Sequence, residues 1–411
     1  MQMAIDVAGF DPSGADELRR AMGSKRSAQR MDRLKERLFA GMASKGVTGA
    51  LAEDLFLKLA AFANYGFPES HAMSFAYLVF ASAWFKRYHP AAFCAALINA
   101  QPMGFYSVQS LVDEARRHGV TVRRPDINAS GAASTLEPPL ETEPGGARGL
   151  HEGERPQRWG YGGPVVRLGL NQVRTISTDL AERIEAERRT GGPYRDMRDL
   201  ARRVAAGGSA SSRPLTAANL EALATADAFA CLPAESGGRM TRREALWAAG
   251  AAAGERPDRL AGTTLGVRAP LLPGMDAVEE MVADVWATGL APDCHPVEFV
   301  REHLIGIGAH RIDHLLTLSD GMRVVVGGLV THRQRPATAS GITFLNLEDE
   351  TGMLNVVCSP GLWQRFRRVA RSANAMVIRG RLELVDGVTN LVAEHLAPLR
   401  LPVRSPSRDF R

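Results

Sequence analysis

The sequence has few cysteines and no apolar run long enough for a membrane. Its cysteines, Cys94, Cys231, Cys294 and Cys358, are dispersed and include no CxxC pair. This excludes a zinc ribbon or a disulfide framework and fits a reduced cytoplasmic compartment. The apolar segment from Ala72 to Tyr88 is too short to span a bilayer comfortably. No basic start with an apolar core and cleavage site follows Met1, so we expect no secretory signal and no membrane contact.

Length and composition then set broad bounds. The 411 residues suffice for two to four domains with sizeable cores. Hydrophobic residues make up 45% and charged residues 23% of the chain, as in ordinary globular proteins. The net charge of +5 and the pI near 9.2 weakly favour a polyanionic partner.

The stretch from residue 61 to residue 106 is the most distinctive part of the chain. A polar loop, GFPESH, precedes a segment that is apolar and aromatic almost all round from Ala72 to Tyr88. That pattern is typical of a helix buried inside a larger protein. Pro90 ends the segment and opens a second apolar helix up to Asn99. The sequence therefore predicts a buried helix hairpin whose polar loop faces a ligand.

A basic cluster lies further upstream. Residues 1 to 60 read as helices, and the segment ADELRRAMGSKR carries Arg19, Arg20, Lys25 and Arg26. Such a run is usually a solvated helix face. Alternatively, these side chains converge on phosphates, as Lys and Arg do in phosphoryl transfer. The residues alone leave both interpretations open.

The middle of the chain mixes helices with a polar linker. Residues 106 to 130 read as a helix, a glycine stop and a short strand. From Gly131 to Gly163 the chain is rich in Gly, Pro, Glu and Arg, which predicts a flexible insertion. A helical pattern follows from Val166, with a turn at Thr175–Ser177. The adjacent Cys294 and His295 have no second pair nearby, so no metal site is predicted.

The last part reads as a β-barrel. Five segments of strand length follow residue 321, with turns between them and a helical segment, GLWQRFRRVARSA, between the third and the fourth. This order predicts an OB barrel, a fold that usually binds single-stranded nucleic acid. The candidate contact residues are His332, Arg333, Arg335, Phe344 and Arg379, although Phe344 is also compatible with a position in the core.

Several of these segments resemble one family. GFPESHAMSFAYLVFASAWFKRYHPAAFCAALINAQPMGFY is similar to the fingers region of bacterial family C DNA polymerases, in particular to the error-prone translesion paralogue of the replicative α subunit. The resemblance continues through HRQRPATASGITFLNLEDETGMLNVV in the predicted barrel. It implies an α+β multidomain fold, with mostly α-helical fingers and a helix–hairpin–helix region followed by a C-terminal OB barrel.

The resemblance also implies roles for particular residues. ADELRRAMGSKR is similar to a fingers segment that lies beside the triphosphate of the incoming nucleotide. This resemblance favours the interpretation that phosphates are bound by Arg19, Arg20, Lys25 and Arg26. Ser70 and His71 in the GFPESH loop are then further nucleotide contacts. The helix–hairpin–helix unit is implied to bind duplex backbones through main-chain N–H groups and helix N-termini, with Thr175 and Ser177 as its contact residues. The family's hairpin has glycine on both sides of an apolar residue, where this chain has Thr175, Ile176 and Ser177. Without those glycines the backbone approaches a phosphate less closely.

What the chain lacks limits the expected activity. Family C polymerases hold Mg2+ with palm aspartates, normally including a DxD pair, and this chain has no DxD. The resemblance covers roughly the C-terminal two-fifths of a full-length enzyme and starts inside the fingers, so a truncated gene, a mis-called start or a split reading frame is expected. No cofactor is expected in this chain, and Mg2+ is expected for the full-length polymerase. No clamp-binding peptide is found, which implies that an accessory translesion protein bridges the chain to the sliding clamp.

The sequence thus predicts the C-terminal portion of an error-prone, DNA-directed DNA polymerase of translesion synthesis. Its expected partners are dNTP, primer-template duplex and single-stranded template. One alternative is a stand-alone DNA-binding accessory factor, and another is the high-fidelity replicative subunit. The predicted domains are fingers (1–130), a flexible insertion (131–163), a helix–hairpin–helix module (164–235), a helical connector (236–320), an OB domain (321–400) and a basic tail that is expected to be unfolded (401–411).

Overall fold

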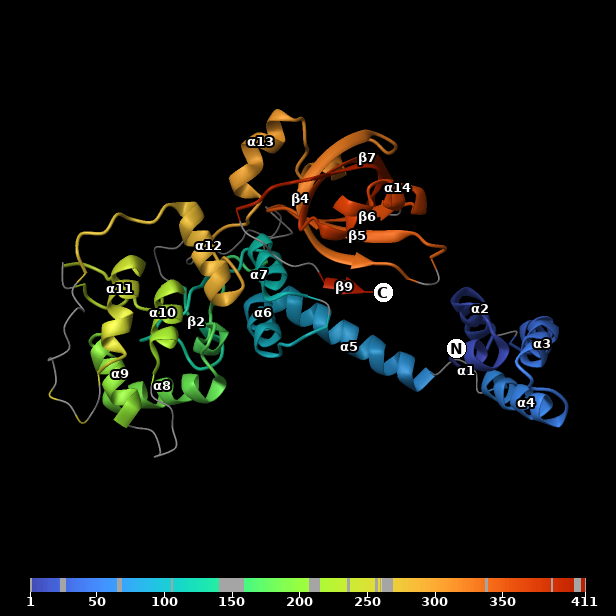
Figure 1. Ribbon diagram of the computed structural model, residues 1–411, viewed down its shortest axis with the longest axis horizontal. Coiled ribbons are helices and arrows are strands. Elements are labelled where there is room, and N and C mark those ends of the chain that lie inside the picture. The colour runs from blue at the N-terminus through green and yellow to red at the C-terminus, as the bar shows by residue number, and fades with distance from the viewer. Residues whose placement is uncertain are drawn as a thin grey trace.

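A computed structural model gives the arrangement of the chain (Figure 1). It describes residues 2–22, 27–64, 69–104, 106–139, 159–206, 215–234, 237–255, 258, 260, 269–336, 339–385, 387–402 and 408–410. Within these residues, no helix is both long and apolar enough to cross a membrane.

The first four helices form a small bundle with its own core. They span Gln2–Ala8 (α1), Pro12–Met22 (α2), Ser27–Ser44 (α3) and Ala50–Asn64 (α4). Figure 1 shows them grouped beyond the N-terminal end of α5. On α3 the core side chains Leu34, Leu38 and Met42 recur every fourth residue, which places them on one helix face. The prediction that this part is mainly helical is confirmed.

The long apolar helix α5, Glu69–Tyr88, forms as predicted but is not buried. Tyr77 is 79% exposed and Phe80 is 74% exposed, and Leu78 and Val79 between them are also exposed. The predicted burial of this helix is therefore wrong for this structure. Apolar character all round shows that a helix needs a cover on every side, but it does not say which element provides the cover. The helix α6, Pro90–Asn99, begins at Pro90 as expected and is partly buried.

A small sheet forms where the sequence predicted a linker. The strands β1 (Val122–Arg123) and β2 (Thr135–Glu137) both pair with β3 (Val165–Arg167), in parallel and antiparallel fashion respectively. Glu137 accepts hydrogen bonds from Arg123 and Arg167, each at 2.9 Å. The prediction of a flexible insertion from Gly131 to Gly163 is therefore wrong for β2, and the prediction of a helical pattern from Val166 is wrong for β3. Pairing between distant segments overrides local composition here. Residues 140 to 158 of the predicted insertion lie outside the described residues.

Helices packed on a shared core follow this sheet. They are η1 (Leu170–Gln172), α8 (Thr178–Gly191), α9 (Met197–Ala206), α10 (Ala217–Thr225), α11 (Arg242–Ala252) and α12 (Ala277–Thr288). A buried ion-pair network joins α12 to α11 and to the residue after β1. Its centre is Asp284 on α12, which accepts hydrogen bonds from Arg124 at 2.9 Å and from Arg242 at 2.7 Å. Removing one member would leave an uncompensated buried charge.

The C-terminal part is a five-stranded barrel. Its strands are β4 (Arg323–Gln334), β5 (Thr343–Glu348), β6 (Met353–Cys358), β7 (Ala375–Val385) and β8 (Val388–Pro398), and α14 (Pro360–Arg365) and α15 (Arg367–Ser372) lie between β6 and β7. The strand order is β5-β6-β8-β7-β4, and a β4–β5 pairing closes the barrel. The pair β6–β8 is parallel. The predicted OB fold, with a helical segment between the third and fourth strands, is confirmed.

Short helices connect α12 to the barrel, and a tail strand follows the barrel. The connectors are η2 (Glu298–Val300), α13 (Arg301–Gly306) and η3 (Asp313–Thr317), and α7 (Val108–Arg117) lies beside the barrel (Figure 1). In the predicted unfolded tail, β9 (Arg408–Phe410) pairs in parallel with His332–Gln334 of β4. The prediction of an unfolded tail is wrong for β9, because the free edge of β4 offers unpaired backbone groups.

Candidate nucleic-acid interface

The turn between η1 and α8 carries the first group of predicted contacts. Both Thr175 and Ser177 are exposed there. The Ser177 hydroxyl accepts a hydrogen bond from the backbone N–H of Leu180 at 3.2 Å and so caps α8. A helix N-terminus favours anions, but Asp179 in the first turn of α8 opposes a phosphate. The turn can therefore meet a DNA backbone mainly through its exposed main chain.

Thr175 adopts a backbone conformation that normally favours glycine. Its φ is 69°, which costs a β-branched residue about 1–2 kcal/mol. The Asn219 side-chain amide donates to the Thr175 carbonyl oxygen at 2.9 Å and to its hydroxyl at 3.2 Å, which holds the turn in place. The chain thus keeps the hairpin conformation without the expected glycines.

Sequence reasoning missed Arg174, which directly precedes this turn. It is exposed, and its guanidinium lies 5.1 Å from the ring centroid of Trp286 on α12. The cation–π contact orients the side chain while leaving its charge available to a phosphate. Its position next to the predicted turn was the signal that could have found it.

The barrel presents a second group of cations on β4 and β7. Arg379 is exposed as predicted. The strand register places Arg323 opposite Arg381, and Arg379 lies two residues from Arg381 on the same side of β7. Glu394 pairs with Arg323 at 3.2 Å. Sequence reasoning missed Arg323 and Arg381, although the alternation of Arg379, Arg381 and Glu383 marks an outward strand face.

Aromatic side chains extend this cationic surface towards α14 and α15. Arg379 lies opposite His395 on β8, and the His395 ring lies 4.7 Å from the ring centroid of Phe366. Arg365 is exposed and its guanidinium lies 5.4 Å from the Phe366 ring. We call the surface of Arg323, Arg365, Phe366, Arg379, Arg381 and His395 the basic face. Cations for phosphates beside rings for bases are what single-strand binding requires.

The other predicted barrel residues do not join this surface. His332 is buried, with its ring 5.7 Å from that of Tyr106. Arg333 is also buried, and its guanidinium donates to the carbonyl oxygens of Ala370 and Ala373 at the end of α15. Both side chains therefore stabilise the fold and do not face solvent.

Arg335 and Phe344 lie at a different end of the barrel from Arg379. Arg335 is exposed, and Phe344 is half-buried opposite Gln334. Arg379 pairs with Val325, which is roughly 30 Å from Arg335 along the strand. The five predicted residues therefore do not form one contiguous surface.

The predicted nucleotide contacts lie on α2 and α5. Arg19 and Arg20 are exposed and both pair with Asp16, at 2.9 Å and 2.8 Å. The hydrogen bond from Arg19, together with the charge of Arg20, holds the pKa of Asp16 below its usual value. Lys25 and Arg26 lie outside the described residues. Ser70 and His71 occupy the first turn of α5, where the exposed His71 ring lies 4.4 Å from that of Phe75.

One group of described residues has the ligand types of a metal site. Atoms of Asp113, His295 and Glu348 lie within 4.8 Å of one another, and all three residues are buried. They do not suit the Mg2+ of a polymerase, which prefers open carboxylate sites with water and substrate phosphates. Cys294 is not part of this group. This group therefore does not supply the catalytic Mg2+ site of a polymerase.

Family comparisons agree with this architecture. Residues 1–46 match the family described as the bacterial DNA polymerase III alpha subunit finger domain. Residues 119–245 match the helix-hairpin-helix motif, and residues 324–399 match the OB-fold nucleic acid binding domain.

Curated relatives match along the whole chain. The error-prone DNA polymerase of Nocardia farcinica is 56% identical over 414 residues, covering 100% of this chain and 33% of the relative. The error-prone DNA polymerases of Mycobacterium tuberculosis and Corynebacterium glutamicum are 51% and 46% identical, and the chain covers 34% and 35% of them. A solved asparaginyl-tRNA synthetase from Pyrococcus horikoshii matches 21% of this chain with a TM-score of 0.18, which is too low to support an argument.

Finger-domain, hairpin and OB-fold matches thus occur in the order in which the structure shows these parts, and identity to the relatives extends from end to end. From end to end the chain is similar to bacterial error-prone DNA polymerases, and it spans about a third of the length of the curated relatives it matches.

Proposed function

We propose that this chain is the DNA-holding portion of an error-prone, DNA-directed DNA polymerase that acts in translesion synthesis and damage-induced mutagenesis. The observation that carries the proposal is the basic face of the barrel, which combines cations and rings on a fold that commonly binds single strands. Identity to error-prone polymerases along the whole chain supports the polymerase over a stand-alone accessory factor.

The parts of the chain would divide the substrate between them. Single-stranded template would lie on the basic face, and duplex would meet the turn of Arg174, Thr175 and Ser177. The incoming dNTP would bind Arg19 and Arg20 on α2 and the start of α5, and Lys25 and Arg26, which lie outside the described residues, are its further proposed contacts. Arg19 and Arg20 can serve there because Asp16 neutralises only one of their two charges.

Catalysis itself would need groups beyond those described. Phosphoryl transfer relies on Mg2+ held by accessible carboxylates, and the described carboxylates do not supply such a site. We propose that the chain alone binds DNA without polymerising, that accessory translesion proteins bridge it to the sliding clamp, and that it acts in the cytoplasm. Template-directed dNTP incorporation by the purified chain above a polymerase-free control would contradict the first of these proposals.

The decisive test is fluorescence anisotropy with single-stranded and primed duplex DNA across a salt series. We expect affinity to fall steeply as salt rises, because bound phosphates release counterions. The double variant Arg379→Ala/Arg381→Ala should reduce the slope of log K against log salt by about 1.4 for single-stranded DNA, or about 0.7 for each lost phosphate contact. The matched control is Arg311→Ala, because Arg311 is exposed but already paired with Asp313 at 3.0 Å.

The outcomes separate the alternatives. An unchanged slope in the double variant would remove the basic face from the binding site. Loss of duplex affinity in Arg174→Ala, with single-strand affinity retained, would assign duplex binding to the hairpin turn. No binding of either DNA by a folded chain would contradict the proposed function.

A further inference from the structure

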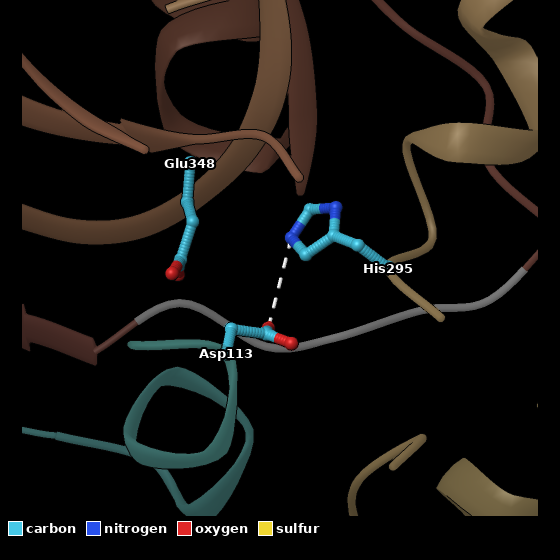
Figure 2. Close-up of side chains that lie close together, drawn as sticks. All are labelled: Asp113, His295 and Glu348. Carbon is cyan, nitrogen blue, oxygen red and sulfur yellow. Dashed lines mark ion pairs between the residues drawn. The ribbon is translucent and has the colours of Figure 1, made fainter. Parts of the chain in front are cut away.

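A buried group of ionisable side chains joins the barrel to the part of the chain from α7 to α12, which we call the helical body. Asp113 lies on α7, Glu348 ends β5 of the barrel, and His295 lies in the loop after α12. Figure 2 shows the three side chains converging from these three directions. His295 is 1% exposed, Asp113 is 3% exposed and Glu348 is 1% exposed. Two carboxyl groups side by side and shielded from bulk solvent cannot both ionise cheaply.

The hydrogen bonds divide these carboxyl groups into one that is satisfied and one that is not. Glu348 accepts from the Arg117 guanidinium at 3.0 Å and from the Ser110 hydroxyl at 3.2 Å. Asp113 accepts from Gln109 at 2.8 Å, but its Oδ1 atom has no hydrogen-bond partner among the described residues. Arg116 lies 3.5 Å from that Oδ1 atom. The negative charge is therefore better accommodated on Glu348 and a proton on Asp113.

The histidine tautomer argues against a metal at this place. The backbone N–H of Val297 donates to His295 Nδ1 at 3.2 Å, which assigns the ring hydrogen to Nε2. Nε2 faces Asp113 at 3.8 Å and makes no hydrogen bond within the part of the chain that the structure describes. A metal would need the Nε2 lone pair, with Nδ1–H donating to an acceptor.

We propose that Asp113, His295 and Glu348 form a proton-binding junction that holds the barrel against the helical body when one proton is bound to the carboxyl pair. The junction is a conformational device that goes beyond the proposed DNA-binding function. Neighbouring contacts join the same parts of the molecule. Arg301 on α13 pairs with Asp349 at 3.0 Å and with Glu350 at 2.7 Å, and Gln109 on α7 accepts a hydrogen bond from the Ala291 amide at 2.7 Å.

The charged surroundings give the sign of the pH dependence. Burial, followed by the Glu348 charge, raises the pKa of Asp113 to about 8, against the opposing effects of Arg116 and Arg117. Burial also raises the pKa of Glu348, with Asp349 adding to the effect and Arg117 and Ser110 opposing it.

His295 titrates in the opposite sense. Burial, together with Arg117, Arg116 and Arg301, lowers the pKa of His295 to about 3. Because the docked Asp113 binds a proton that the solvated carboxyl releases, docking weakens as pH rises from about 4 to about 8. Docked His295 excludes a proton that the solvated ring binds below about 6.5, so docking strengthens with pH up to that value. The Asp113 and His295 effects oppose each other below about pH 6.5, and above that value the Asp113 effect continues to about pH 8 without the His295 effect.

Hydrogen exchange of the full chain between pH 5 and pH 9.5 tests this junction without DNA. The reporters are the Ala291 amide, which donates to Gln109, and the Ile312 amide, which donates to Asp349. After correction for intrinsic exchange, their protection should fall about tenfold per pH unit between about 6.5 and 8 and then level off. Amides of Leu345 and Leu354 inside the barrel serve as the reference for folding.

Two variants and one control make the test specific. Asp113→Asn should keep protection constant over that pH range, because the amide cannot release a proton. Glu348→Gln removes the charge that repels ionised Asp113, so the fall should move to lower pH. Glu114→Gln, on the same helix but partly exposed, should retain the wild-type response. Should Asp113→Asn not fold, as the reference amides would show, the shift in Glu348→Gln decides the matter.

Three results would overturn the proposal. One is a flat pH response in the wild type, and another is a wild-type response that persists in Asp113→Asn or does not shift in Glu348→Gln. The third is stoichiometric binding of Zn2+ or Mn2+ that increases protection at Ala291 and is lost in Asp113→Asn, since this would make the group a metal site.

Discussion

The helix α5 and the C-terminal barrel both contain many large apolar side chains, but these side chains are mostly exposed on α5 and buried in the barrel. In the barrel, Leu345, Leu347 and Val356 are fully buried, and the β4–β5 pairing closes the sheet around them. On α5, large apolar side chains such as Leu78 and Phe80 are mostly exposed. A barrel supplies both sides of its own core, whereas a helix that is apolar all round needs covering by other elements.

This difference shows what an apolar pattern can and cannot indicate. An apolar pattern indicates which surface of an element should be buried. In the barrel, the strands that bury this surface belong to the same domain. For α5 the described residues contain no such cover. The relatives are about three times as long as this chain, and we propose that their additional length covers α5.

The largest expected effect compares the same truncation in both regions. Leu347→Ala in the barrel should lower the free energy of unfolding by about 2–5 kcal/mol, because it leaves a cavity in a closed core. Leu78→Ala on α5, where the side chain is 58% exposed, should change it by less than about 0.5 kcal/mol. Urea-dependent hydrogen exchange of barrel and α5 amides measures both. Equal losses would show that α5 is packed in solution.

A second prediction concerns self-association through α5. Because large apolar side chains of α5 are exposed, we expect the purified chain to associate with itself through this helix. Burying one phenylalanine contributes about 1.5–3 kcal/mol, so Phe80→Glu should weaken that association by about one to two orders of magnitude. Sedimentation velocity over a concentration series provides the measurement. The matched control is Val388→Glu, an exposed apolar residue of the barrel hairpin, which should leave association unchanged. Equal weakening by both substitutions would contradict a specific role of α5.

A third prediction compares two glycines. A Cβ at Gly380 in β7 would lie 2.3 Å from the Val392 carbonyl oxygen, so Gly380→Ala should cost about 1–3 kcal/mol of barrel stability. A Cβ added at Gly250 on α11 would meet no neighbouring atom within 4 Å, and Gly250→Ala should stabilise its helix by up to about 1 kcal/mol. Thermal unfolding followed by circular dichroism measures both changes. A neutral Gly380→Ala would mean that the barrel is looser than its register suggests.

The smallest expected effect concerns the cap of α8. Ser177→Ala should lower stability by about 1 kcal/mol, because the Leu180 amide loses its side-chain acceptor. The neighbouring exposed Thr178→Ala should change stability by less than about 0.5 kcal/mol. Comparing duplex affinity of the two variants separates capping from DNA contact. A duplex loss in Ser177→Ala well beyond its effect on stability would make the hydroxyl a direct contact.

Local patterns predicted the elements better than the site. Alternating apolar residues and turn signals predicted the barrel strands, and Pro90 marked the start of α6. Arg333 was predicted as a DNA contact from its charge, yet its guanidinium binds the carbonyl oxygens at the end of α15. A charge in a sequence does not reveal whether its partner is a phosphate or the chain itself.

The sequence by itself determined the helices of the first part and the OB barrel, because periodicity and turn chemistry act over a few neighbouring residues. The likeness to error-prone DNA polymerases rested on the resemblance of whole segments. Only the tertiary structure decided that Thr135–Glu137 joins a sheet, that Arg323 and Arg381 meet across β4 and β7, and that Asp113, His295 and Glu348 converge. Those residues are far apart in the sequence. Their contacts depend on strand register and packing, which a local sequence pattern does not predict.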